Sequence, residues 1–414
     1  MLISAILLLG LLSLSVAEFR DVKHATVIEF PALNCRKHSA VLTGFGGVGD
    51  GKTSNTEVFK AAIANLSHLA ADGGAQLVVP PGKWLTGSFN LTSHFTLFIH
   101  KDAIILGARD ETEWPLLPVL PSYGRGRDAP GGRFSSLIFG TNLTDVIITE
   151  RQSNLRKMIN CFRLSEIILL ISNLTLINSP SWNVHPIYSS DIIIQYLTII
   201  APVDSPNTHG IDPDSCTNTR IEDSFVVSGD DCIAVKSGWD QYGIRFNMST
   251  KHLVIRRFTC ISPDSATIAL GSEMSGGIED VRAENITAIN TESGVRIKTA
   301  VGRGDPGFNP KALPKIKGIN YKDIVADNVT YSARLEGIKN DPFTDICISN
   351  VDIKLTAKPK ELQWNCTDVQ GVTNKVTPDA CNLLPEKEID CTFPEERLPI
   401  EDVKLKTCSI SDNI

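Results

Sequence analysis

The chain has 414 residues, 40 basic and 47 acidic side chains, and a formal net charge of -7. This excess of acidic groups argues against nucleic acid as a partner, because nucleic-acid-binding surfaces need a basic footprint. It does not exclude an acidic polysaccharide, provided that the binding cleft is locally basic. The length exceeds what one compact core usually supports, so we expect two domains or an elongated repeat.

The first 17 residues, MLISAILLLGLLSLSVA, are apolar and end in small side chains. They predict a secretory signal peptide cleaved near Ala17, and no later stretch approaches the roughly 18 apolar residues of a membrane span. Glycosylation sequons, which have meaning only in exported proteins, occur at Asn65, Asn90, Asn142, Asn173, Asn247, Asn285, Asn328 and Asn365. We therefore expect a secreted, extracellular glycoprotein without a membrane span.

The ten cysteines suit disulfides formed in an oxidising compartment. Cysteines close in the sequence are expected to pair, namely Cys216 with Cys232, Cys366 with Cys381 and Cys391 with Cys408. Buried free thiols remain the alternative for each pair. No Cys-x-x-Cys or His/Glu spacing predicts a metal, and no cofactor is expected.

Residues 18–75 are predicted to form an N-terminal cap. Val41 to Thr43 favours a strand, and Asn55 to Ala71 favours an amphipathic helix. The apolar residues at helical spacing are Phe59, Ile63, Leu66 and Leu69, and a glycine pair ends the segment. We expect no second helix before the C-terminus.

From residue 76 onward, short β-branched runs repeat to the end of the chain. Seven segments share one template: ISNLTLINS from Ile171, IQYLTIIAP from Ile194, IEDSFVVSG from Ile221, IRRFTCISP from Ile255, AENITAINT from Ala283, ADNVTYSAR from Ala326 and ISNVDIKLT from Ile348. The successive starts lie 23, 27, 34, 28, 43 and 22 residues apart. A repeat of this period built from strands predicts a β-solenoid over residues 76–414, whose coils bury their apolar faces by stacking.

Two stretches depart from the repeat. The interval of 43 residues after Ala283 is about two coils long, yet GRGDPGFNPKALPK stands where a strand is expected. The stretch TERQSNLRKMINCFRLSE, in a region without glycine between Gly140 and Gly210, shows neither alternation nor turn chemistry. Both indicate lost or replaced sequence, with one rung irregular or missing in the interval of 43 residues.

A second ladder of segments carries polar side chains: HGIDPD, DCIAVK, ATIALG and SGVRIK. Stacked strands lie about 4.8 Å apart, so equivalent positions form columns. We expect three columns: His209, Asp231, Ala266 and Ser293; Asp212, Ala234, Ala269 and Arg296; Asp214, Lys236, Gly271 and Lys298. Carboxylates beside cations are what cleavage of an acidic sugar chain requires.

These motifs resemble glycoside hydrolase family 28, the polygalacturonases, in SPNTHGIDPDSC, VSGDDCIAVKSG, IALGSEMSGG and GVRIKT. The resemblance covers nearly the whole mature chain. It implies an all-β, right-handed parallel β-helix with a short N-terminal capping helix. It also implies a monomer in the plant cell wall that hydrolyses α-1,4-linked galacturonan, the homogalacturonan of pectin, with inversion.

By the same resemblance, Asp230 matches the general acid and Asp231 matches a carboxylate that activates the attacking water. Arg296 and Lys298 match the pair that holds galacturonate. We expect Asn207 and Asp212 to lie beside the substrate as well.

Two departures from the family pattern put the activity in doubt. The family has Asn-Thr-Asp-Gly where this chain has Asn207-Thr208-His209-Gly210, and its Gly-His-Gly falls on Ser265-Ala266-Thr267. Loss of one acid from a unit of three can remove several orders of magnitude in rate. His209 could act as a base in its place, since a free imidazole titrates near 6.5. We expect weak or absent hydrolysis; the alternatives are an inactive pectin-binding wall protein and a chain too altered to fold.

Three further features have simpler interpretations. Residues 46–53, GGVGDGKT, satisfy the phosphate-loop pattern, but the signal peptide, the sequons and the absence of alternating strand and helix units argue against a nucleotide hydrolase. Gly229-Asp230-Asp231 alone would indicate a turn with positive φ, but its register with the other ladders favours the site over a simple turn. His185 and Lys236 are expected to be structural.

Overall fold

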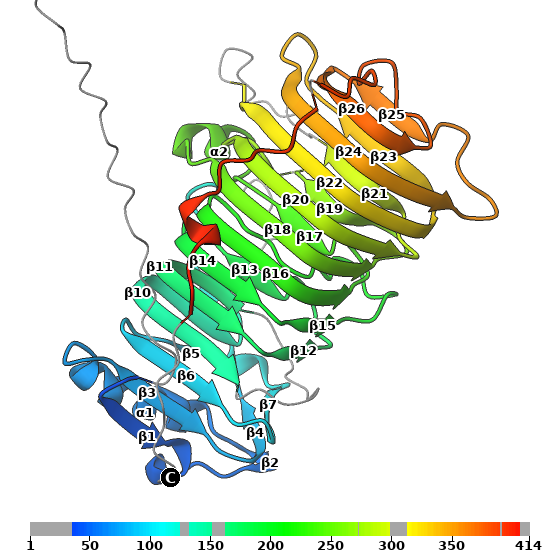
Figure 1. The fold of residues 1–414 in the computed structure, drawn as a ribbon. Helices are drawn as coiled ribbons and strands as arrows, with labels where there is room; N and C mark the ends of the chain where they lie inside the picture. The colour runs from blue at the N-terminus through cyan, green and yellow to red at the C-terminus, as the bar shows by residue number, and fades with distance from the viewer. Residues whose placement is uncertain are drawn as a thin grey trace, which may run out of the picture.

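The computed structural model describes residues 35–124, 132–150, 162–271, 273–298, 313–389 and 391–405. The predicted signal peptide and Cys408 lie outside the described residues, as does most of both irregular stretches. Figure 1 shows a stack of parallel coils that rises from the N-terminal part of the chain to the C-terminal part.

The largest sheet runs the length of the stack. Its main path is β1 (His38–Val41), β3 (Ala75–Val79), β6 (Phe95–Ile99), β10 (Ile138–Glu150), β11 (Phe162–Ser172), β14 (Ser190–Gln195), β16 (Thr217–Val227), β18 (Thr250–Ile261), β20 (Ile278–Ile289), β22 (Ile316–Val329), β24 (Phe343–Leu355) and β26 (Val369–Thr377). Four short strands join it: β5 (Phe89–Asn90), β12 (Thr175–Ile177), β13 (Val184–Pro186) and β15 (Thr198–Ile200). Neighbours along the path pair in parallel, as in a β-helix.

Three smaller sheets complete the strands. A parallel sheet of short strands contains β17 (Ile233–Val235), β19 (Ala266–Leu270), β21 (Ser293–Lys298), β23 (Tyr331–Glu336) and β25 (Trp364–Thr367). A second contains β2 (Asp50–Ser54), β4 (Gly82–Thr86) and β7 (Ala103–Gly107), and β8 (Leu116–Leu117) pairs with β9 (Arg133–Phe134) in the antiparallel sense. The helical segments are α1 (Thr56–Ala70), α2 (Asp240–Phe246), η1 (Leu42–Phe45), η2 (Glu111–Glu113) and η3 (Pro399–Glu401).

Apolar side chains stack in columns through the long sheet. One column passes through fully buried residues of successive coils: Leu97, Ile148, Ile171, Ile194, Ile221, Ile255 and Ala283. Side chains along a strand point alternately to its two faces, so a constant register keeps one apolar set inside. The repeat predicted from the sequence is therefore confirmed up to Ala283.

The register predicted for the next coil is wrong. Ala283 pairs with Tyr321, whereas Ala326 pairs with Ala288. Apolar alternation continues through most of β22, so the ADNV segment resembled the start of a coil although it lies near the end of one. β20 pairs directly with β22, β21 with β23, and β10 with β11. The described strands on either side of each irregular stretch are therefore neighbours in the stack.

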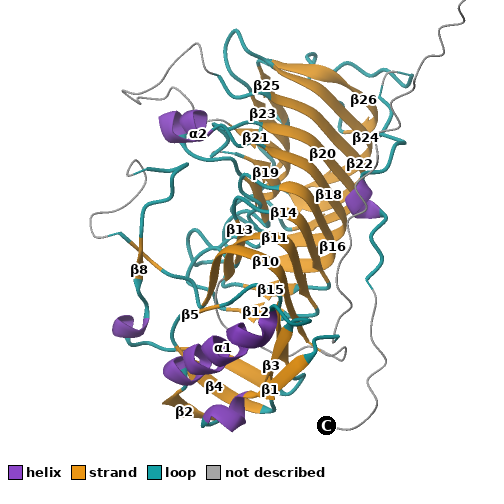
Figure 2. Cartoon of the chain, turned by 90° about the vertical axis from the view of Figure 1, so that its left-hand side faces the viewer, coloured by secondary structure: helices purple, strands orange, loops and turns teal. Residues whose placement is uncertain are grey.

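The N-terminal cap contains the predicted helix. α1 buries Phe59, Ile63 and Leu66, whereas Leu69 is exposed, and Figure 2 shows α1 beside the strands at this end of the stack. The strand predicted to reach Thr43 ends at Val41, and η1 begins at Leu42.

The phosphate-loop pattern folds into a different structure. Its last residues lie in β2, and the backbone N–H groups of Lys52 and Thr53 both donate to Asp50 Oδ1 at 2.8 Å. The Asn55 side chain accepts a hydrogen bond from Val48 N at 2.8 Å, and this bond holds the same loop against the start of α1. Because its own side chains bind these amides, the loop does not present them to a phosphate.

The disulfides correct two of the three predicted pairs. Cys366–Cys381 is confirmed, but Cys232 pairs with Cys260 and Cys391 pairs with Cys347, and Cys216 is a buried free thiol. The corrected pairs span 28 and 44 residues. Stacking brings cysteines of different coils together, so distance along the chain is a poor guide to pairing.

Two further features lie outside the strand pattern. α2 contradicts the expectation of a single helix; its seven residues, interrupted by Gly243, are too few for a helical period to show. The C-terminal segment lies along the outer face of the long sheet (Figure 1), where Arg220 Nη1 donates to the carbonyl of Ile400 at 2.8 Å. Among the described residues, no helix is long and apolar enough to cross a bilayer.

Candidate active site

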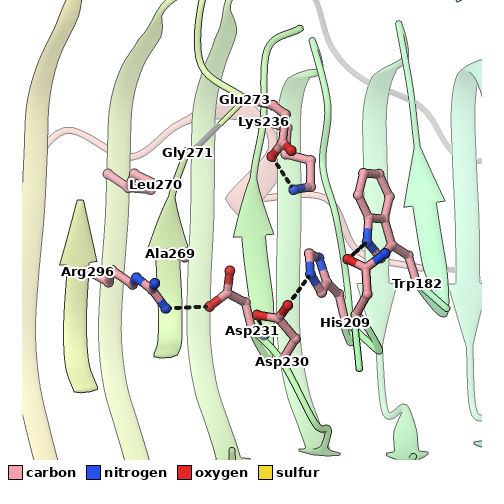
Figure 3. A pocket seen from close by; sticks show the side chains of 11 residues that line it. Trp182, His209, Asp230, Asp231, Lys236, Ala269, Leu270, Gly271, Glu273 and Arg296 are labelled. Carbon is pink, nitrogen blue, oxygen red and sulfur yellow. Dashed lines mark hydrogen bonds and ion pairs between the residues drawn. The ribbon is translucent and has the colours of Figure 1, made fainter. Parts of the chain in front are cut away.

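The polar columns predicted from the sequence are confirmed by the register of the coils. Ile211 bridges to Ile233, which places His209 and Asp231 at equivalent positions. Ala266 pairs with Ser293 and Ala269 pairs with Arg296. Residues remote in the sequence therefore meet beside the short strands β17, β19 and β21 (Figure 3).

These columns border a cavity of about 160 Å³. Its lining residues are Trp182, Asn207, His209, Asp230, Asp231, Lys236, Ala269, Leu270, Gly271, Glu273 and Arg296. The cavity thus unites five of the seven predicted site residues. Asp212 is fully buried and does not line the cavity, and the side chain of Lys298 lies outside what the structure describes.

The imidazole of His209 lies between two carboxylates. Its Nδ1 is 2.6 Å from Asp212 Oδ1, and its Nε2 is 3.3 Å from Asp230 Oδ2. Burial alone would lower the pKa of His209, but the charge of Asp212 and hydrogen bonds to both carboxylates raise it to about 9. His209 is therefore protonated at neutral and mildly acidic pH.

This cation acts on Asp230 in turn. Burial tends to raise the pKa of Asp230, but the hydrogen bond and charge of His209 outweigh it and lower that pKa well below its usual range. A hydrogen bond from Ser265 acts in the same direction. Asp230 is therefore held as a carboxylate.

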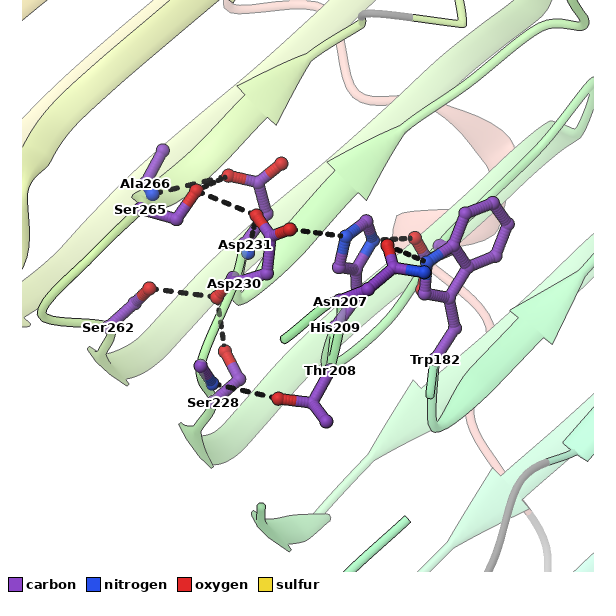
Figure 4. Close-up of polar contacts among 12 residues, drawn as sticks. Trp182, Asn207, Thr208, His209, Ser228, Asp230, Asp231, Ser262, Ser265 and Ala266 are labelled. Atoms are coloured by element: carbon purple, nitrogen blue, oxygen red, sulfur yellow. Dashed lines mark hydrogen bonds and ion pairs between the residues drawn. The ribbon is translucent and has the colours of Figure 1, made fainter. Parts of the chain in front are cut away.

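Ser265 links the acidic and basic sides of the cavity, as Figure 4 shows in part. Its Oγ lies 2.8 Å from Asp230 Oδ1 and 2.6 Å from Asp231 Oδ1, and it accepts a hydrogen bond from Arg296 Nη1 at 2.8 Å. The backbone N–H of Ala266 also donates to Asp231 Oδ1, at 3.2 Å. The segment that departs from the family's Gly-His-Gly thus holds both aspartates in place.

Trp182 and Lys236 close the other side of the cavity. Lys236 Nζ lies 2.7 Å from Glu273 Oε2 and 4.3 Å from the centre of the Trp182 ring. Trp182 stacks on His209 with ring centres 5.1 Å apart and an angle of 17° between the planes, and its Nε1 donates to Asn207 Oδ1 at 3.1 Å. Lys236 is buried, but it faces the cavity, whereas the expectation from the sequence gave it only a structural role.

Gly229 is required by close approach and not by a positive φ, so the simple turn interpretation, which the alignment of the ladders already disfavours, does not explain it. A Cβ on Gly229 would lie 2.2 Å from Ser205 O. His185 is packed as expected, with Nε2 3.1 Å from Asp214 Oδ2.

Sequence reasoning missed Trp182, Ser265 and Glu273 as site residues. Trp182 lies outside the aligned segments, and Ser265 attracted notice only as a departure from the family pattern. Glu273 lies two residues after Gly271, a member of the third predicted column. Its place beside Lys236 depends on the path of the chain after β19, which strand periodicity does not determine.

Comparisons with known proteins agree with this geometry. The profile of "Glycosyl hydrolases family 28" matches residues 150–407. A "Probable polygalacturonase" of Vitis vinifera is 55% identical over 455 positions, covering 97% of this chain and 93% of the relative. That alignment is longer than the chain, so the relative has residues that this chain lacks. An "Exopolygalacturonase" of Zea mays is 24% identical, with 88% of this chain and 83% of the relative covered.

Solved structures show the same fold. The exopolygalacturonase of Thermotoga maritima superposes with a TM-score of 0.67 at 23% identity, covering 86% of this chain and 94% of that one. The polygalacturonase of Erwinia carotovora superposes with a TM-score of 0.59 at 17% identity, covering 88% and 98%. The fold is a right-handed parallel β-helix, as predicted, and the chain belongs to glycosyl hydrolases family 28.

Proposed function

We propose that this chain is a secreted polygalacturonase-type glycosidase of the plant cell wall that binds homogalacturonan and hydrolyses it with strongly reduced efficiency. The observation that carries the proposal is the contact of 3.3 Å between His209 Nε2 and Asp230 Oδ2. The substrate follows from the family and from the relatives named polygalacturonase. The reduced rate follows from the charges within the cavity.

Inverting hydrolysis needs a protonated carboxylic acid on one side of the bond and a base on the other. Asp230, in the position of the general acid, is held ionised by His209. His209, in place of a carboxylate, is already protonated and cannot accept a proton from water. The substitution therefore impairs both halves of the reaction.

An aspartate at position 209 would have the opposite effect. A second carboxylate close to Asp230 would raise the pKa of Asp230, because like charges disfavour ionisation. It would also provide a base for the attacking water. The charge at position 209 thus decides whether Asp230 carries the proton that the reaction needs.

The rest of the cavity is suited to binding an acidic sugar. Arg296 keeps a side chain that is 19% exposed at the cavity edge, where a galacturonate carboxylate could accept two parallel hydrogen bonds. Asn207 also lines the cavity, whereas Asp212 is placed to orient His209. If turnover proves absent, these groups still support the second candidate, a pectin-binding wall protein.

Secretion and glycosylation are part of the same proposal. None of the eight sequon asparagines is buried. This agrees with glycosylation on an exported surface. Mass spectrometry of the protein purified from the plant cell wall tests both points.

The decisive experiment is reducing-end release from polygalacturonate near pH 5, with the wild type, His209→Asp, Asp230→Asn and the double variant. General acid–base catalysis contributes about 10²–10⁴-fold, so His209→Asp should gain activity on this scale. Asp230→Asn should remove that gain. His252→Asp, which changes a histidine in a surface pair with Asp280, is the matched control and should leave the rate unchanged.

Wild-type activity equal to that of His209→Asp would contradict the proposal. Binding of polygalacturonate without turnover in the wild type and in His209→Asp would favour the pectin-binding protein.

A further inference from the structure

Three side chains with metal-binding atoms converge in the cavity from two adjacent coils. His209, Asp230 and Asp231 each offer an atom within 4.8 Å of the others. His209 Nε2 and Asp230 Oδ2 are 3.3 Å apart. Two ligands of one Zn²⁺, each about 2.0–2.2 Å from the ion, lie about 3 Å apart at tetrahedral angles. This pair already has the separation that a shared ion requires.

The orientation of His209 is a second, independent observation. Asp212 is fully buried, and its Oδ1 lies 2.6 Å from His209 Nδ1. A histidine that binds a metal usually donates its other ring N–H to a carboxylate, which sets the tautomer and the ring orientation. The stacking of Trp182 further restricts the ring. Nε2 is thereby the nitrogen directed at Asp230.

The oxygen atoms needed for ligation belong to Asp230 and Asp231, which both line the cavity. Asp231 Oδ1 is engaged by Ser265 and the N–H of Ala266, whereas Oδ2 accepts no hydrogen bond from the described residues. Asp230 is similar, since Oδ1 binds Ser265 and Oδ2 faces His209. Each aspartate thus has one oxygen held by the protein and one directed elsewhere.

The formal charges around the ring also favour a divalent cation. The carboxylates are Asp212, Asp230, Asp231 and Glu273. The cations are Lys236 and Arg296. Four negative and two positive groups leave two negative charges when the imidazole is neutral. A divalent ion would neutralise them.

We propose that His209, Asp230 and Asp231 bind one divalent first-row transition ion of the Zn²⁺ type, with Asp212 orienting the imidazole. One imidazole and two carboxylates suit Zn²⁺, Co²⁺ and Mn²⁺ better than Ca²⁺ or Mg²⁺, which prefer oxygen ligands alone. The cavity of about 160 Å³ has room for water to complete the coordination. The nitrogen ligand exists only because histidine stands at position 209.

The test is calorimetric titration of Zn²⁺ into the full-length, EDTA-treated protein without any sugar. It is done at pH 8, where Zn²⁺ competes better with the proton on Nε2. The wild type should bind one equivalent that His209→Gln and Asp230→Asn lose. His252→Gln is the matched control, because His252 Nδ1 lies 2.9 Å from Asp280 Oδ2 in a surface pair, and it should bind as the wild type does.

Visible absorption of the Co²⁺ complex, displaced by Zn²⁺, should report nitrogen and carboxylate ligation in the wild type and not in His209→Gln. Circular dichroism melting shows which variants are folded. If His209→Gln does not fold, the loss of Zn²⁺ binding is tested with Asp230→Asn alone. Unchanged binding in both variants, or binding lost with His252→Gln, would overturn the metal site. Because no sugar is present, this result is independent of the hydrolysis assay.

Discussion

The apolar columns of the long sheet and the polar columns beside the short strands belong to the same coils, yet they depend on sequence in different ways. In the long sheet, Ile221 and Ile255 are stacked and fully buried, and another apolar side chain of similar size would serve there. Beside the short strands, the same stacking places His209 next to Asp230, and the identity of one residue sets the charge of its neighbour. Coil stacking therefore sets where the side chains lie in both regions. Only in the polar columns does that placement also determine which side chains are protonated.

The largest effect should come from breaking an apolar column. Ile324 is 1% exposed in β22, whereas the adjacent Val325 is 54% exposed on the other face of the same strand. Ile324→Ala should lower the free energy of unfolding by about 2–5 kcal/mol, because it removes buried methyl groups and leaves a cavity. Val325→Ala should change it by less than about 0.5 kcal/mol. Urea denaturation measures both changes. Equal losses of unfolding free energy in the two variants would show that packing in the apolar column does not stabilise the fold.

The next effect tests how far the polar columns stabilise the fold. The pKa of His209 in the folded state, about 9, exceeds its ordinary value of 6.5. The stability that comes from its protonation is therefore present below pH 6.5 and is lost as the pH rises through 9. A shift of this size corresponds to about 3 kcal/mol.

Urea midpoints at pH 6 and pH 9.5 check this prediction. The wild type should lose more stability over this range than His209→Gln, and His252→Gln should behave as the wild type does. Parallel pH profiles for the wild type and His209→Gln would mean that the imidazole is not held between charged carboxylates.

A smaller effect should separate two arginines of one column. Arg296 pairs with Arg334 of the next coil, but Arg334 Nε already donates to Glu336 Oε1 at 2.7 Å. Hydrogen bonds to charged groups contribute about 1.5–3 kcal/mol, so Arg296→Ala should weaken oligogalacturonate binding by about 10–100-fold. Arg334→Ala should weaken it less, because Arg334 does not line the cavity and its Nε donates to Glu336. Calorimetric titration tests the difference, and equal losses would extend the binding surface to the next coil.

Much of the fold could be predicted from local patterns. Alternation in each coil and the spacing of the template located most strands of the long sheet, and helical spacing located α1. The prediction failed where two registers satisfy the same alternation, as at Tyr321 and Ala326. It also failed for α2, which is too short to show a period.

The candidate site was predicted in part. Aligning four segments predicted that His209, Asp231 and Arg296 lie along one groove, because residues at equivalent positions of successive coils are neighbours in the stack. The partners outside those segments, Trp182 and Glu273, were not found, since the loops that carry them have no period. Cys232 was paired wrongly for a different reason, because its partner Cys260 lies in the next coil and not close in the sequence.

The sequence by itself determined the repeat, the residues that face the core and the order of the polar columns, because each depends on periodicity within one coil. Only the tertiary structure decided the protonation of His209 and Asp230. Their charges depend on burial and on distances to Asp212 and Ser265 across neighbouring turns of the chain, and electrostatic energy follows those distances and not separation along the sequence.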